Sequence, residues 1–180
     1  SAASDVYKRQ LIEESEKTGS IEKREFAYQT YLEQMPQASH SYKVKYQLAQ
    51  LEVERKNYEN AAQLFHNLAL DKQGDPDLRK KSADLALDNL AIQKNDVQIQ
   101  KWSSEFVNEF PKASDEFREI NRKATVNIVA GTTNNENSGS SDLKAALSQL
   151  DSLDTSKMSE SQKITHFKNR ALIGLSLIHI

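Results

Sequence analysis

The sequence predicts an all-α fold built from stacked pairs of antiparallel helices. Glycine and proline are scarce, with five and three among 180 residues, while Ala, Leu, Gln, Glu and Lys are abundant and favour helices. Apolar residues recur every three or four positions, the period of an amphipathic helix. Two of the three prolines lie in similar five-residue motifs, "MPQAS" and "FPKAS", and each motif follows an amphipathic segment. This repetition indicates one helical unit used more than once.

The two ends of the chain look like translated sequencing adaptors. Residues 1–10, SAASDVYKRQ, are what a transposase-based adaptor and its mosaic end encode. Residues 175–180, LSLIHI, translate the reverse complement of that mosaic end. Because both ends match in opposite orientation, we expect both to be adaptor-derived and not native, and exclude them from fold reasoning. Residues 11–174 are then expected to be a metagenomic fragment of a larger bacterial protein.

Helices follow one another along this native part. We expect them at 11–17, 21–34, 41–55, 58–70, 77–93, 96–110 and 115–130. The first six form three pairs, and the last opens a fourth. Only "ERKN" separates the two helices of the second pair, a turn short enough to make them antiparallel.

Proline marks the expected boundaries between pairs. Pro36, Pro76 and Pro111 are each predicted to stop a helix, because proline has no N–H to donate and restricts the residue before it. In the repeated phrase, Ser39 or Ser114 is predicted to cap the following helix through its side-chain oxygen.

The stretch YQLAQLEVERKNYENAAQLF resembles one full tetratricopeptide repeat (TPR), a helical hairpin of 34 residues. Leu48 and Ala49 match the Leu–small pair of its first helix, and Tyr58, Ala61 and Phe65 match the aromatic, small and aromatic positions of its second. The resemblance covers most of residues 21–111 and is weaker over the remainder of the chain. It implies that 11–130 forms TPR-like repeats in a right-handed superhelix, an α-solenoid.

A second unit, GSIEKREFAYQTYLEQMP, resembles the latter half of such a repeat, with Gly19, Ile21, Tyr28 and Pro36 in register. The repeats are also similar in style to those of bacterial envelope proteins such as the TolA-binding protein. That similarity implies a cell-envelope location, periplasmic or associated with the outer membrane, with the cytoplasm as the alternative.

Some positions depart from the family pattern. Arg24 stands where the first unit has a small residue, and Glu52 stands where the second has an aromatic one. The third unit fits only loosely, through Ile99, Trp102 and Phe106. Trp102 is predicted to lie in the core, because it shares a helical face with Phe106 at i+4.

Residues 131–142, GTTNNENSGSSD, are the one low-complexity stretch and are predicted to form a flexible polar loop. It is either a lengthened turn within one hairpin or a linker to a separate unit. Residues 143–174 are predicted to be a further, truncated hairpin, whose last helix opens with a capping box made by Ser159 and Gln162.

The resemblance implies a binding groove on the concave face, lined by the first helix of each pair. Carried over by position, the groove residues are Lys43, Tyr46, Gln47, Gln50, Asp84 and Asp88. Such a face suits an extended segment or a helix of a partner protein. Tyr46 has the alternative of packing between hairpins.

No catalytic or cofactor-binding pattern emerges. His40, His66 and His166 lie far apart without a second ligand at metal spacing, so no metal site is predicted. Asp84 and Asp88 share one helical face and could act as paired carboxylates, but are interpreted as a solvated or ligand-facing strip. We therefore expect no enzyme activity and no cofactor.

Charge and composition limit the partners. The formal net charge of −2 is spread along the chain, unlike the clustered basic face of a nucleic-acid-binding protein. Without cysteine there is no disulfide framework, and no apolar run reaches the roughly 20 residues that a membrane helix needs. Two hypotheses remain, a scaffold that binds a protein or peptide segment and a structural spacer that self-assembles. The oligomeric state and the partner stay open.

Overall fold

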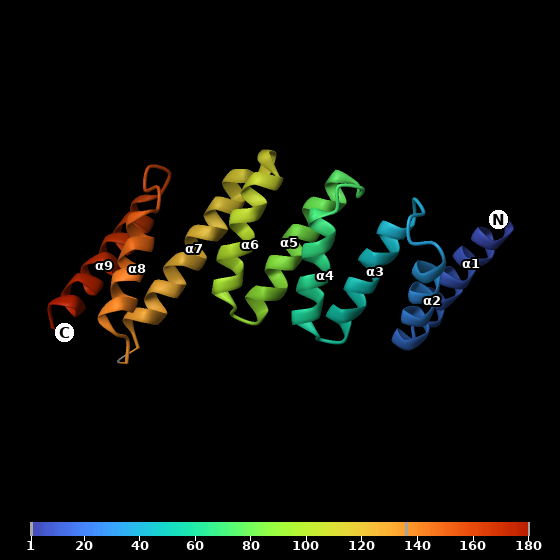
Figure 1. The fold of residues 1–180 in the computed structure, drawn as a ribbon, viewed down its shortest axis with the longest axis horizontal. Helices are drawn as coiled ribbons and strands as arrows, with labels where there is room; N and C mark the ends of the chain where they lie inside the picture. Colours follow the sequence, from blue (N-terminus) through green and yellow to red (C-terminus); the bar gives the residue numbers. More distant parts are fainter. Residues whose placement is uncertain (1, 136, 180) are drawn as a thin grey trace. The chain divides into compact units, whose positions relative to one another are not determined.

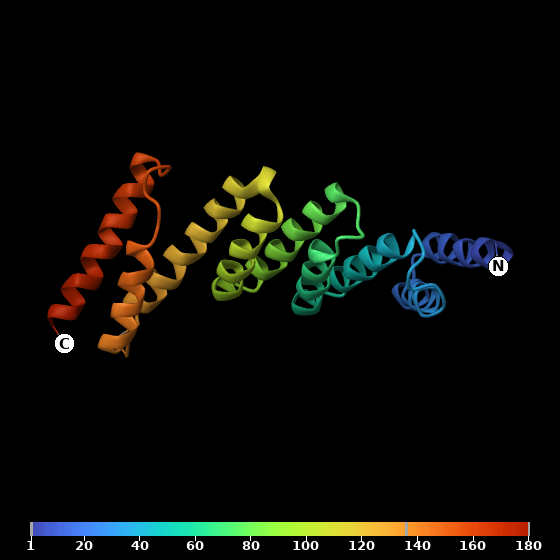
Figure 2. The ribbon, with the colours of Figure 1, turned by 45° about the horizontal axis from the view of Figure 1, so that its top comes forward.

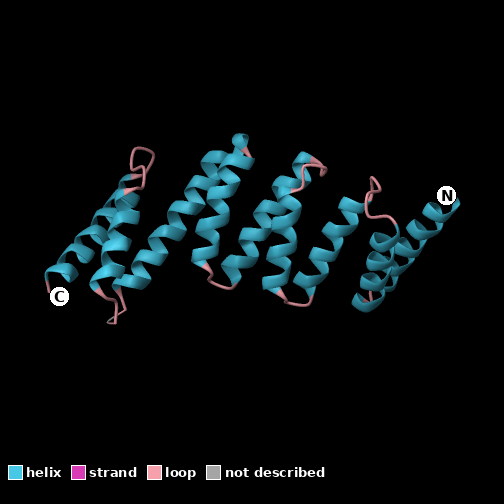
Figure 3. Cartoon of the chain, in the orientation of Figure 1, coloured by secondary structure: helices cyan, strands magenta, loops and turns pink. Residues whose placement is uncertain are grey.

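In the computed structural model, which describes residues 2–135 and 137–179, the chain is helical (Figures 1 and 3). No strand occurs within these ranges. The chain divides into two compact units, Ser1–Lys94 (unit 1) and Asn95–Ile180 (unit 2). The predicted all-α class is therefore confirmed.

Unit 1 contains five helices among its described residues, each packed against the next. They are α1 Ala2–Thr18, α2 Ile21–Gln34, α3 Ser41–Glu54, α4 Tyr58–Leu70 and α5 Pro76–Ile92. Two of the turns contain a residue in the left-handed region, Gly19 at φ 69° and Lys56 at φ 60°. Glycine adopts this conformation without cost, whereas Lys56 adopts it against the preference of its Cβ.

The core of unit 1 is built from buried residues of neighbouring helices. Buried residues of α1, α2 and α3 form one cluster: Ile12, Ala27, Tyr28, Tyr31, Val44 and Leu51. Between α3 and α4, Ala49 and Ala61 are fully buried beside the buried ring of Phe65. Small side chains at such positions allow two helix backbones to approach. The small residues Ala49 and Ala61 and the large residue Phe65 therefore contribute to helix packing.

Unit 2 contains α6 Asp96–Glu109, the short 3-10 helix η1 Pro111–Ala113, α7 Ser114–Thr133, α8 Ser140–Asp151 and α9 Glu160–Ile178. Helix α7 packs against α6, α8 and α9 (Figure 2). The rings of Phe106, Phe110 and Phe117 form an aromatic cluster with centroids 5.4–5.9 Å apart. A second cluster joins Val129, Leu143, Ala146, Leu150 and Ile173. Trp102 is buried, as predicted.

Pro76 does not stop a helix. It is the first residue of α5, where its missing N–H costs nothing and its fixed φ suits the helix. Asp75 caps this helix by accepting hydrogen bonds from the backbone N–H groups of Asp77 and Leu78, each at 3.0 Å. The prediction for Pro76 was therefore wrong, because α4 had already ended at Leu70.

Neither Ser39 nor Ser114 caps a helix. The residue before α3 is His40, which makes no side-chain capping bond, and Ser114 is already the first residue of α7. The phrase after Pro36 instead closes in a tight turn, in which the hydroxyl of Ser41 donates to the carbonyl of Met35. The capping box of Ser159 is present, with Gln162 bonded in both directions at 3.3 and 2.8 Å.

The polar loop is shorter than 131–142. Helix α7 continues to Thr133, and the hydroxyls of Thr132 and Thr133 donate to carbonyls one turn earlier. Helix α8 begins at Ser140, where Asp142 accepts a hydrogen bond from the N–H of Gly139. Helices α7 and α8 pack against each other within unit 2.

Some other boundaries also differ from the expectation. Helix α1 starts at Ala2 and α9 continues to Ile178, so both expected adaptor-derived segments extend helices. Residues that favour helices continue a helix whatever their origin. The expected pair 77–93 and 96–110 is divided between the two units, as α5 and α6.

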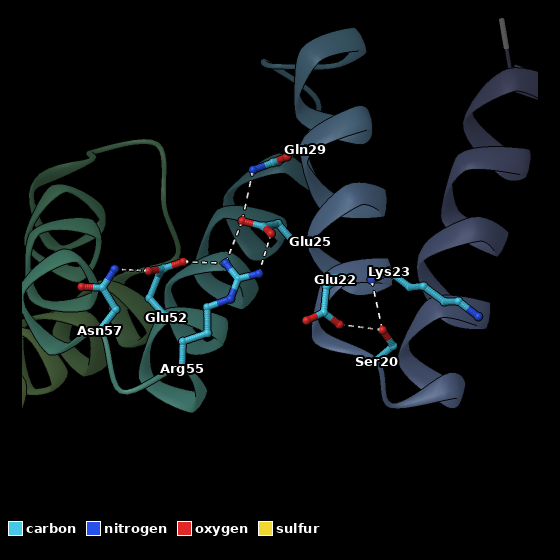
Figure 4. A network of polar contacts seen from close by, with 8 residues as sticks. All are labelled: Ser20, Glu22, Lys23, Glu25, Gln29, Glu52, Arg55 and Asn57. Carbon is cyan, nitrogen blue, oxygen red and sulfur yellow. Dashed lines mark hydrogen bonds and ion pairs between the residues drawn. The ribbon is translucent and has the colours of Figure 1, made fainter.

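The two departures from the repeat pattern lie in two neighbouring sets of ion pairs between α2 and α3. The guanidinium of Arg24 donates two hydrogen bonds to the carboxylate of Glu54, at 3.0 and 2.7 Å. That of Arg55 binds both oxygens of Glu25 and also donates to the buried Glu52, at 3.1 Å (Figure 4). Charge-assisted, bidentate pairs of this kind are the stronger ion pairs in proteins. They cross-link α2 to α3 where the family pattern has a small and an aromatic residue.

These ion pairs predict a loss of stability in acid. Hydrogen bonds from Arg55 lower the pKa of Glu25, and those from Arg24 lower the pKa of Glu54, below the ordinary 4.5. A carboxylate with a lowered folded-state pKa stabilises the fold above its unfolded pKa and loses that contribution as pH falls through the folded value. We expect the double variant Glu25→Gln/Glu54→Gln to be less stable than the wild type at pH 7, and the gap to close below about pH 4.5.

Urea denaturation followed by circular dichroism at several pH values measures this gap. The exposed Glu59, which makes no ion pair with any described residue, supplies the control variant Glu59→Gln. A gap between wild type and double variant that does not change with pH would contradict the role of the two carboxylates.

Candidate functional site

Lys43 and Gln47 line a small cavity in unit 1. The cavity has a volume of about 200 Å³ and lies among α1, α2 and α3. Its other lining residues are Arg9, Ile12, Glu13, Glu16, Tyr28, His40 and Val44. Lys43 is exposed and Gln47 is half-buried. These two predicted groove residues thus line the same cavity.

Two titratable side chains of this cavity, His40 and Tyr28, favour their neutral forms. Burial lowers the pKa of His40, with Lys43 and Arg9 adding to the effect. Burial also raises the pKa of Tyr28, whose hydroxyl donates to Glu16 at 2.8 Å. The cavity therefore offers a neutral imidazole and a phenol already engaged in a hydrogen bond, beside the ammonium group of Lys43.

Tyr46 belongs to the core. Its side chain is 5 % exposed, and its ring meets that of Phe65 edge-on with centroids 5.5 Å apart. The ammonium group of Lys81 lies 5.9 Å from the centroid of the Tyr46 ring, within the range of a cation–π contact. The Tyr46 hydroxyl has no hydrogen-bond partner among the described residues. The alternative that Tyr46 packs between helices agrees with this placement.

The remaining predicted residues do not line that cavity. Gln50 is half-buried on α3, and Asp88 is exposed on α5. Asp84 is paired with Lys80 of its own helix, with a distance of 2.8 Å between the ammonium nitrogen and a carboxylate oxygen. The predicted groove residues are thus distributed among a cavity, the core and the surface of α5.

A larger cleft, which the sequence did not reveal, lies in unit 2. It has a volume of about 530 Å³, and we call it the unit 2 cleft. It is lined by Ser104, Val107 and Asn108 of α6, by Asp115, Arg118, Glu119, Asn121 and Arg122 of α7, and by Ser152, Leu153, Asp154, Lys157 and Met158 between α8 and α9. Three segments that are distant in the sequence therefore meet around one concavity.

Paired charges surround the unit 2 cleft. Asp115 accepts hydrogen bonds from Lys157 at 2.9 Å and Arg118 at 3.0 Å, and its pKa is lowered mainly by the bond from Lys157. Glu119 accepts from Arg122 at 2.9 Å, which lowers the pKa of Glu119. Asp115, Arg118 and Lys157 are well exposed, and exposed ion pairs of this kind are weak because water and salt screen them. An incoming ligand could therefore replace them at little cost.

The inner wall of the unit 2 cleft combines apolar and amide groups. Val107 and Leu153 are half-buried and Met158 is buried. The amide of Asn121 donates to the carbonyl of Gln100 at 2.6 Å and so is fixed in orientation. Ligand-binding clefts typically combine an apolar wall with a small number of polar groups of fixed orientation.

A charge pattern could have revealed this cleft from the sequence. In "DEFREINR", Asp115, Arg118, Glu119 and Arg122 lie at i, i+3, i+4 and i+7, and so share one face of a helix. The resemblance to TPR repeats implied groove residues only up to Asp88, because it is weaker beyond residue 111.

Comparison of the chain with models of known protein families, with curated proteins and with solved structures gave no match. Within residues 2–135 and 137–179, no helix has the length and apolar character needed to cross a membrane. In the same ranges, no three His, Asp or Glu side chains gather in a way that could hold a metal ion.

Proposed function

We propose that this chain is a non-catalytic scaffold that binds a segment of a partner protein between its helices. In this proposal the helices continue a TPR-like α-solenoid, a right-handed superhelix in which each pair stacks on the next. Support comes from the short interhelical turns and from the small residues, such as Ala49 and Ala61, buried between helices. A bacterial envelope location remains part of this hypothesis, on the similarity of repeat style alone.

The observation that carries the proposal is the unit 2 cleft. Its apolar wall, formed by Val107, Leu153 and Met158, can take one apolar side chain of the partner. Exposed Arg118 and Lys157 can bind acidic side chains on one flank of that residue, and Asp115 and Asp154 can bind basic ones. The favoured partner is therefore an extended segment with one apolar residue between charges of both signs.

Selection of peptides from a random displayed library on residues 1–180 tests this function. We expect the selected peptides to bind Val107→Arg at least about tenfold more weakly, because the arginine fills the cleft and places a charge against its apolar wall. The matched control is Val97→Arg, on the same helix at an exposed position outside the cleft. Equal affinity of the peptides for both variants would overturn the proposal.

The structural spacer remains the alternative. An exposed apolar face on α9 favours it, since a spacer must bury such surface against another molecule or segment. A chain that yields no peptide ligand but associates with itself would support this alternative.

A further inference from the structure

Helix α9 carries an unpartnered apolar stripe. Ile164, Phe167, Leu172, Leu175 and Ile178 are more than half exposed, and Phe167 is 56 % exposed. Their spacing, with Ala171 among them, places them on one side of the helix. The opposite side, which carries Ile173, is buried against α7 and α8. Helix α9 is therefore apolar on two sides, and one of them has no cover among the described residues.

A cation lies inside this stripe. Lys168 is one turn after Ile164 and one turn before Leu172, so its ammonium group projects from the same face. It makes no ion pair with any residue that the structure describes. The stripe thus offers apolar side chains with one unpaired positive charge among them.

An apolar groove lies on unit 1, between α1 and α2. Its volume is about 400 Å³, and its lining residues are Leu11, Glu14, Ser15, Glu22, Lys23, Phe26 and Ala27. The ring of Phe26 is 68 % exposed there, an unusual position for phenylalanine. Glu14 and Glu22 make no ion pair with a described residue, and Glu22 accepts a hydrogen bond from the hydroxyl of Ser20 at 3.0 Å. The groove has the opposite balance of charge to the α9 stripe.

We propose that α9 of one copy of this chain docks in the α1–α2 groove of a second copy. Phe167 and Leu172 would cover Leu11 and Phe26, and Lys168 would meet Glu14 or Glu22. The charge complementarity favours this pairing over a contact between the α9 stripes of two copies, in which Lys168 of one copy would face Lys168 of the other. The residues that carry it lie within 11–174, and it does not depend on the unit 2 cleft.

This contact is head-to-tail, because it joins two different surfaces. After the first contact forms, one copy keeps a free groove and the other keeps a free stripe. Such heterologous contacts produce rings when the rotation closes and open chains when it does not. Association is therefore expected to continue past the dimer as the protein concentration rises.

Sedimentation velocity over a concentration series tests the proposal with residues 1–180. We expect the wild type to associate, and Phe26→Glu and Phe167→Glu each to raise the dissociation constant by at least about 100-fold, because either one buries an unpaired charge in the contact. Val97→Glu, which changes an equally exposed residue outside both surfaces, should associate as the wild type does. Circular dichroism of each variant checks that the helices remain.

Mixing the two non-associating variants provides the decisive result. Phe26→Glu keeps an intact α9 stripe and Phe167→Glu keeps an intact groove, so their mixture should form a dimer and nothing larger. A wild type that stays monomeric, a Phe26→Glu variant that still associates, or a mixture that stays monomeric would each overturn the proposal.

A charge reversal gives a second test that leaves the apolar residues unchanged. Lys168→Glu should weaken association about two- to fivefold, as expected for an exposed ion pair. Mixing Lys168→Glu/Phe26→Glu with Glu14→Lys/Glu22→Lys/Phe167→Glu should then give tighter dimers than mixing Lys168→Glu/Phe26→Glu with Phe167→Glu. Equal dimer affinities in the two mixtures would overturn the proposed register.

Discussion

Replacing Phe106 with alanine should lower the free energy of unfolding by about 3–5 kcal/mol. The Phe106 side chain is fully buried, and its ring lies 5.4 Å from that of Phe117 and 5.9 Å from that of Phe110 between centroids. Truncation removes these contacts and leaves a cavity that the rigid helices α6 and α7 cannot fill. Urea denaturation followed by far-UV circular dichroism measures the loss.

Two further variants separate the cavity from other effects. Phe106→Leu keeps most of the volume and should cost less than about 1.5 kcal/mol. Phe26→Ala makes the same chemical change at an exposed ring, and in dilute protein should change the stability by no more than about 0.5 kcal/mol. Similar losses for Phe106→Ala and Phe26→Ala would contradict the assignment of Phe106 to the core.

The helices were predictable because their signals are local. The expected helix 58–70 coincides with α4, and 21–34 coincides with α2. In both segments the apolar period continues until a turn signal interrupts it. The burial of Ala49, Ala61 and Phe65 followed from the same spacing, since a helix that packs on one side fixes which positions are inside.

The capping residues were less predictable, because they depend on how the chain closes between helices. "MPQAS" and "FPKAS" look alike, but the first forms a tight turn before α3 and the second forms η1 and enters α7. A serine at the same place in the phrase therefore meets different backbone groups. The local pattern could not distinguish these two outcomes.

The candidate site was the least predictable part. Tyr46 was assigned to a groove by its position in the repeat, yet the ring of Phe65 and the neighbouring helix leave it only 5 % exposed. The unit 2 cleft combines residues near 104, 118 and 157, and so depends on contacts between distant segments. A sequence pattern of short range can indicate one wall of such a cleft, but not the other two.

Replacing Arg55 with leucine should lower the free energy of unfolding by about 2–3 kcal/mol. Arg55 binds Glu25 on α2 and Glu52 on α3, and the Glu52 side chain is only 11 % exposed (Figure 4). Without the guanidinium, Glu52 keeps one partner, the amide of Asn57 at 2.7 Å. A buried carboxylate that loses its counter-charge is strongly destabilising, whereas a partly solvated one costs less.

A double-mutant cycle shows whether Glu52 is the reason for this cost. Glu52→Leu removes the buried carboxylate and restores an apolar residue where the repeat pattern has an aromatic one. We expect the double variant Glu52→Leu/Arg55→Leu to lose at least about 1 kcal/mol less free energy of unfolding than the sum of the losses of the two single variants. Glu52→Leu combined with Arg24→Leu should be close to additive, because Arg24 binds Glu54 and not Glu52. Additivity in both cycles would mean that Arg55 acts through Glu25 alone, and that the departures at positions 24 and 52 are independent of each other.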